Sequence, residues 1–83
     1  MINNVIMQLR ISLEENKQEL YEIEIKIKRL IAEMQLTLTP FYKSFEEIKA
    51  EEIEQCADEL LKAKKEAVQI QSRISDIKNQ LGE

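Results

Sequence analysis

The chain has 83 residues, of which 43% are apolar and 34% are charged, and its net charge is −4. This length suits one small domain, and the apolar fraction is too high for a disordered polyanion. One glycine and one proline are too few turn residues for an all-β fold and exclude a glycine-rich phosphate loop. The sequence therefore predicts a single all-α domain over residues 1–83.

The first half of the chain carries a heptad repeat, with apolar residues at alternating four- and three-residue steps. Its seam positions are Ile2, Ile6, Leu9, Leu13, Asn16, Leu20, Ile23, Ile27, Leu30 and Met34. Such a 3.5-residue period is typical of a coiled coil and predicts a helix over about residues 2–37. Because Thr39 precedes Pro40, it should leave the helical conformation, and we expect a turn over about residues 38–44.

The second half repeats the pattern and predicts a helix over about residues 45–81. Its seam positions are Ile53, Cys56, Leu60, Ala63, Ala67, Ile70, Ile74, Ile77 and Leu81. Two starts are plausible for this helix: Thr39 with Pro40 at the first helical position, or Ser44 with Glu47 as a capping box. Gly82 is a natural stop after the last seam residue.

These two segments predict an antiparallel two-helix coiled-coil hairpin closed around the turn. The predicted layers pair Leu30 with Ile53, Ile27 with Cys56, Leu20 with Ala63, Asn16 with Ala67, and Ile6 with Ile77. The charges beside this seam oppose the pairing. They place Lys17 against Lys64, Glu19 against Glu66, and Glu33 against Glu52, with only Lys26 and Glu59 attractive. The alternative is one continuous helix, kinked at Pro40, that pairs with a second chain.

A second apolar stripe lies nearly opposite the seam. Its main members are Met7, Ile11, Tyr21, Ile25, Leu61 and Val68, with Ala32 and Ala57 beside them. A helix that is apolar on two sides normally has two partners, so we expect two hairpins to form a four-helix bundle. Scattered surface residues are the alternative.

Two further features near the turn have both a structural and a functional interpretation. The aromatic residues Phe41, Tyr42 and Phe45 either close the hairpin end or form a docking tip. An acidic face is predicted from Glu47, Glu51, Glu54 and Asp58. It is either a solvated helix face or a patch for a basic partner, such as a mimic of nucleic-acid phosphate.

Asn16 is the one polar residue in the seam, and a buried Asn fixes register and oligomeric state. Cys56 is expected to be a small buried apolar residue rather than a nucleophile, since the chain has no histidine to activate it. We therefore expect no catalytic, cofactor or metal site. A single cysteine also favours a reducing cytoplasm.

These features favour a non-enzymatic protein–protein interaction module: an adaptor, chaperone or assembly subunit that forms a homodimer and binds a further protein. An acidic inhibitor or nucleic-acid mimic is the first alternative. Direct nucleic-acid binding is disfavoured by the net charge of −4. It would use Lys62, Lys64, Lys65 and Arg73 with Lys26, Lys28 and Arg29. No apolar run approaches the ~20 residues of a membrane span.

Overall fold

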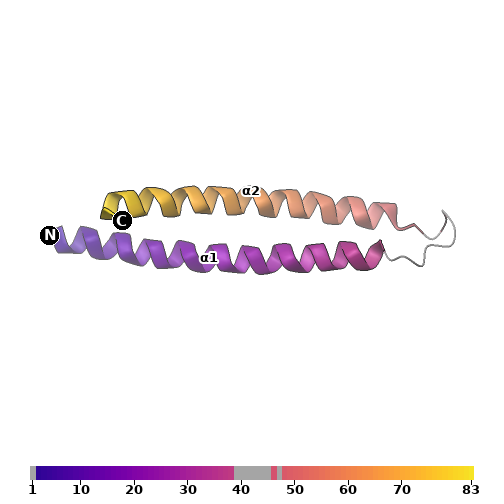
Figure 1. The fold of residues 1–83 in the computed structure, drawn as a ribbon, viewed down its shortest axis with the longest axis horizontal. Coiled ribbons are helices and arrows are strands. Elements are labelled where there is room, and N and C mark those ends of the chain that lie inside the picture. Colours follow the sequence, from indigo (N-terminus) through magenta and orange to yellow (C-terminus); the bar gives the residue numbers. More distant parts are fainter. Residues whose placement is uncertain (1, 39–45, 47) are drawn as a thin grey trace.

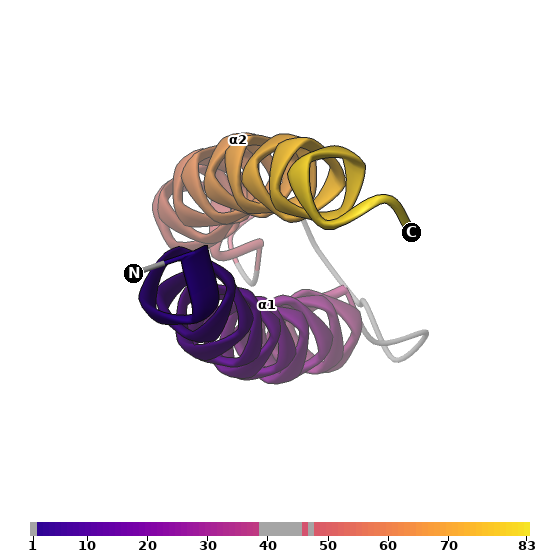
Figure 2. The same ribbon diagram turned by 90° about the vertical axis from the view of Figure 1, so that its left-hand side faces the viewer.

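The computed structural model describes residues 2–38, 46 and 48–83. It contains two helices, α1 (Ile2–Thr37) and α2 (Ala50–Leu81), and no strand within those residues. The helices lie side by side and antiparallel in a hairpin 67 Å long (Figure 1). Viewed end-on, they are inclined in opposite directions (Figure 2). The predicted all-α hairpin is confirmed, and the continuous kinked helix is wrong.

The seam predicted from the heptad repeat is where the two helices meet. Of the described residues, the buried ones are Leu13, Asn16, Leu30, Ala63, Ile70 and Ile77. All belong to the predicted seam. The seam residues from Leu9 to Met34 and from Ile53 to Leu81 that are not buried are half-buried, and Ile6 is 40% exposed. Within the described ranges, neither helix has a stretch apolar enough to cross a membrane.

Helix α1 ends where the sequence predicts, and its last turn is closed by local hydrogen bonds. The Thr37 hydroxyl donates to the carbonyl oxygen of Glu33 at 2.9 Å. The backbone N–H of Leu38 donates to the carbonyl oxygen of Met34, also at 2.9 Å. The bond to Met34 satisfies one of the four carbonyls that the helix end leaves without an intrahelical partner, and the Thr37 hydroxyl adds a second donor to the Glu33 carbonyl.

Helix α2 begins at Ala50, five residues later than predicted. The proposed caps at Thr39 and Ser44 lie outside the described residues. Lys49 precedes the helix and makes no side-chain cap, while Glu51 and Glu52 lie in the first turn near the positive end of the helix dipole. A start near residue 45 would carry α2 beyond the end of α1, where it has no helix to pack against.

The C-terminal end of α2 is stopped by Gly82, as predicted. Gly82 has φ 79° and ψ 19°, the left-handed conformation that glycine adopts without steric cost. Its N–H donates to the Asn79 carbonyl at 3.1 Å, and the N–H of Glu83 donates to the Lys78 carbonyl at 2.8 Å. This pair of bonds is a Schellman motif.

The register of the seam differs from the predicted one by about one heptad. The thiol of Cys56 contacts Glu33, not the level of Ile27. One groove between the helices joins α1 residues 33–37 to α2 residues 52–59, and another joins residues 19–23 to residues 66–73. Both grooves place Leu30 across from Leu60, whereas the prediction paired it with Ile53. A heptad repeat cannot distinguish registers that differ by a whole heptad.

This register leaves the N-terminal end of α1 without an opposing helix. By the register of the two grooves, Leu9 lies across from Leu81, the last residue of α2. The N-terminal end of α1 accordingly extends beyond the end of α2 (Figure 1). The exposure of Ile6, a seam residue that was predicted to pair with Ile77, follows directly. Ile77 is instead buried at the level of Leu13, which is also buried.

Candidate functional site

The predicted outer stripe is exposed along the whole hairpin. Its six members, from 47% exposed for Ile11 to 58% for Met7 and Tyr21, are Met7, Ile11, Tyr21, Ile25, Leu61 and Val68. The two alanines beside them, Ala32 and Ala57, are also exposed. The folded hairpin therefore leaves these side chains uncovered.

Antiparallel pairing puts the stripes of both helices on one face. Going round each helix from the seam, heptad positions e and then b follow on one side, and g and then c on the other. Antiparallel helices bring like edges together, so the b positions of both share a face. Tyr21 is a b residue of α1, and Leu61 and Val68 are b residues of α2.

The observed register places part of the stripe on one side of the hairpin. By that register Tyr21 is level with Val68, and Leu61 lies two helical turns further toward the turn end of the hairpin. Ile31 and Ala57 are exposed e residues on the same side. We call these residues the outer apolar face: Tyr21, Ile31, Ala57, Leu61 and Val68. Ile25 borders it, whereas Met7 and Ile11 lie apart, near the N-terminal end of α1.

Ile31 was not predicted from the sequence, because it lies beside the seam and not in the apolar stripe opposite it. Its e position was the available signal, because an isoleucine there widens the apolar surface of α1. Other exposed large apolar side chains lie outside the outer apolar face. Besides Met7, Ile11 and Ile25, they are Val5, Ile6, Leu36, Leu38 and Ile48.

The charges beside the seam suit the observed register better than the predicted one. Glu19 lies near Arg73, and both line the same groove. The same register sets Glu24 opposite Lys64 and Lys26 opposite Glu66 along the seam. The ion pairs found among the described residues are within α1, Glu14 with Lys17 at 3.7 Å and Arg29 with Glu33 at 3.9 Å. The opposition of charges noted in the sequence therefore came from the wrong register.

Cys56 is half-buried, and it does not face Ile27 as predicted. Its Sγ donates a hydrogen bond to Oε2 of Glu33 at 3.9 Å. Burial raises the pKa of this thiol, and the nearby carboxylates of Glu33, Glu59 and Glu52 raise that pKa further. A thiol held protonated is a weak nucleophile, so Cys56 is poorly suited to covalent chemistry.

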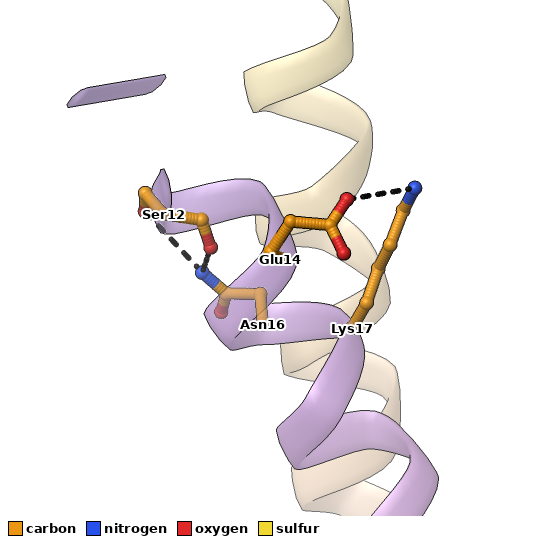
Figure 3. Close-up of polar contacts among 4 residues, drawn as sticks. All are labelled: Ser12, Glu14, Asn16 and Lys17. Atoms are coloured by element: carbon orange, nitrogen blue, oxygen red, sulfur yellow. Dashed lines mark hydrogen bonds and ion pairs between the residues drawn. The ribbon is translucent and has the colours of Figure 1, made fainter. Parts of the chain in front are cut away.

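Asn16 is buried in the seam with only half of its amide satisfied. Its Nδ2 donates to the carbonyl oxygen of Ser12 at 2.7 Å and approaches the Ser12 hydroxyl at 3.4 Å (Figure 3). Its Oδ1 is buried and has no hydrogen-bond partner. In this register Ile74, and not the predicted Ala67, lies across from Asn16. The apolar side chain of Ile74 offers no hydrogen-bond donor to that oxygen and leaves no room for a water.

The predicted acidic face is only partly described. Glu51, Glu54 and Asp58 are exposed on α2, and Glu47 lies outside the described residues. Glu33 from α1 joins Glu52 and Glu59 at the groove beside Cys56, so negative charge gathers at this end of the hairpin. No group of His, Cys, Asp and Glu within the described ranges is placed to hold a metal ion.

The aromatic tip, Phe41, Tyr42 and Phe45, falls outside the residues that the structure describes. The surface with the clearest geometry is thus the outer apolar face.

Comparison of the chain with protein-family models, curated proteins and solved structures found no match.

Proposed function

We propose that this chain is a non-enzymatic protein–protein interaction module, an adaptor, chaperone or assembly subunit, built as a homodimer of hairpins. The outer apolar face is the dimer contact, and the assembly is a four-helix bundle. The observation that carries the proposal is that Tyr21 and Val68 are both exposed apolar residues, on different helices, and that the groove joining residues 19–23 to residues 66–73 sets them at one level. Surfaces of this kind on small proteins mark sites of association.

The thinness of the core supports the same proposal. Five apolar side chains are buried among the described residues: Leu13, Leu30, Ala63, Ile70 and Ile77. A scaffold of this size rarely gains enough free energy from a single thin core. Packing two outer apolar faces together adds a second apolar layer to each hairpin. The Glu24 and Lys64 side chains, which have opposite charges, lie among the residues of the face. A second copy of the hairpin carries the same two charges and can set each of them opposite its counter-charge.

Light scattering of Tyr21→Glu and Ile25→Glu tests the dimer. We expect each variant to halve the molar mass of the native protein, because the new carboxylate would lose its hydration between two apolar faces. Gln8→Glu is the matched control, since it adds the same charge to α1 at an exposed c position, on the side of the helix away from the face. An unchanged molar mass and an unchanged set of bound proteins in both variants would contradict the proposal.

The aromatic residues Phe41, Tyr42 and Phe45 are proposed as the contact for a further protein partner. The support is compositional, since aromatic side chains concentrate binding free energy at interfaces. Phe41→Ala and Phe45→Ala should leave the dimer mass unchanged and remove proteins that co-purify with the native chain. The reducing cytoplasm, where a free thiol such as Cys56 persists, is the proposed location.

An acidic mimic is the second candidate, favoured by the negative charge that Glu33, Glu52 and Glu59 bring to one groove. It would bind a basic protein through the neighbouring acidic face. Replacing Glu47, Glu51, Glu54 and Asp58 with their amides should then abolish binding while leaving the dimer intact. Binding of duplex DNA at low salt, lost steeply as salt rises, would instead favour a nucleic-acid binder and contradict both candidates.

A further inference from the structure

The two helices can close their seam in two registers that differ by one heptad. In the observed register Leu30 lies across from Leu60. In the second register, α2 slides along α1 by about 10 Å, at 1.5 Å per residue, so that Leu30 meets Ile53. The repeat is regular in both helices, and each seam residue therefore moves from one seam residue to the next. We propose that the hairpin switches between these registers and that ionic strength sets the balance.

Apolar burial differs little between the two registers, because one end of the seam is exchanged for the other. The observed register half-buries Met34 and Thr37 and leaves Ile6 exposed. The second register covers Ile6 with Ile77 and uncovers Met34. The occupant of the exposed N-terminal part of α1 is thus α2 itself. The connection of residues 38–49 is long enough for both positions, since an extended chain spans ~3.3 Å per residue.

The charges beside the seam favour the observed register. That register sets three attractive pairs opposite each other, Glu19 with Arg73, Glu24 with Lys64, and Lys26 with Glu66, against two like-charged pairs, Arg10 with Lys78 and Glu33 with Glu59. Within the described residues no ion pair of 4.0 Å or less joins the two helices, so these charges act across longer distances. The second register keeps one attractive pair, Lys26 with Glu59, against three like-charged pairs, Lys17 with Lys64, Glu19 with Glu66, and Glu33 with Glu52. All these side chains except the half-buried Glu59 and Lys78 are exposed, so salt screens them and weakens the preference.

Asn16 favours the second register. In the observed register its buried Oδ1 has no partner and lies at the level of Ile74. In the second register Asn16 faces Ala67, whose small side chain leaves room for a water that satisfies the oxygen. The charges and Asn16 therefore act in opposite directions, which is the arrangement that a small change in conditions can reverse.

Disulfide trapping with the native Cys56 tests the register directly, because it shows which position of α1 lies across from Cys56. Cys56 lies across from Met34 in the observed register and across from Ile27 in the second. We expect Met34→Cys to form the intramolecular disulfide roughly tenfold faster than Ile27→Cys at low salt, with the two rates converging at about 1 M salt. Mass spectrometry counts only the intramolecular product, so the outcome does not depend on the proposed dimer.

Leu20→Cys is the out-of-register control, because Leu20 faces Cys56 in neither register. The switch is overturned if Ile27→Cys never exceeds this control, or if the ratio of the Met34→Cys and Ile27→Cys rates does not change with salt.

A charge variant tests the same proposal from the other side. Glu66→Lys places two lysines together in the observed register but pairs with Glu19 in the second. It should raise the rate at which Ile27→Cys forms the intramolecular disulfide with Cys56 roughly tenfold at low salt. Glu15→Lys makes the same charge change away from the seam and should leave the ratio unchanged. An equal effect of both variants would show that net charge, and not pairing across the helices, controls the trapping.

Discussion

Sγ of Cys56 lies 3.9 Å from Oε2 of Glu33, and this contact joins α2 to α1 near the turn end of the hairpin. It fixes the register, because Ile27, the partner that periodicity predicted for Cys56, lies six residues or about 9 Å further along α1. It also sets the chemistry of the thiol. The Glu33 carboxylate accepts a hydrogen bond from the thiol and opposes formation of a second negative charge beside it.

We predict that Glu33→Gln makes Cys56 more reactive. Burial raises the pKa of the thiol above its ordinary value of 9.0, and the Glu33 carboxylate raises it further. Removing that charge favours the thiolate, so alkylation by iodoacetamide at mildly alkaline pH should become several-fold faster. Glu51→Gln, on the exposed surface of α2, is the matched control and should leave the rate unchanged.

The same thiol gives stability a defined pH dependence. Its pKa is raised in the folded state, so the folded protein holds the proton more tightly than the unfolded chain. This contribution is therefore fully present below pH 9.0 and is lost as pH rises through the pKa of the folded state. Urea midpoints of native protein and Cys56→Ala should diverge below that pH and converge above it. A constant difference between the two midpoints would contradict this assignment.

Leu30→Ala should be strongly destabilising. Leu30 is 1% exposed, the smallest exposed fraction among the buried apolar residues of the seam. Its truncation leaves a cavity between α1 and α2 and should lower the free energy of unfolding by about 3 kcal/mol, measured by urea denaturation at fixed protein concentration. Leu36→Ala is the control, since Leu36 is 72% exposed and should change the unfolding free energy little. Equal losses in both variants would place the core elsewhere.

Gly82→Ala should loosen the last turn of α2. An alanine at φ 79° brings its Cβ close to the backbone and costs about 1 kcal/mol. The bonds to the Asn79 and Lys78 carbonyls should weaken together, and the amides of residues 82 and 83 should exchange hydrogen faster. Glu83→Ala keeps the glycine and should preserve protection of the residue 82 amide. Unchanged exchange in Gly82→Ala would mean that the Schellman motif does not hold this end.

Much of the fold follows from the sequence because the heptad repeat is a direct record of burial. It predicted the end of α1, the stop at Gly82 and the seam that holds Leu13, Leu30 and Ile77. The start of α2 did not follow, because helix formers continue into residues 45–49. Only the position of α1 shows that a helix there would have nothing to pack against.

The register did not follow either, and with it the shape of the outer apolar face. Layers displaced by a whole heptad bury equivalent residues, so apolar periodicity cannot distinguish the two registers. The like-charged pair of Glu19 and Glu66 in the predicted register was the signal. Displacing α2 by one heptad brings Arg73 to Glu19 and sets Val68 level with Tyr21. Exposed charges, individually worth about 0–1 kcal/mol, were the better guide here because the apolar terms were balanced.

Asn16→Leu should stabilise the hairpin. The substitution removes a buried oxygen that has no hydrogen-bond partner and adds an apolar side chain across from Ile74, for a gain of about 1–2 kcal/mol in the free energy of unfolding. Asn79→Leu makes the same chemical change at an exposed position of α2 and corrects for the better helix propensity of leucine. A loss of stability in Asn16→Leu beyond that control would mean that the amide is satisfied in solution. A water held in the seam would then be part of the fold, and Asn16 would stabilise the register that it occupies.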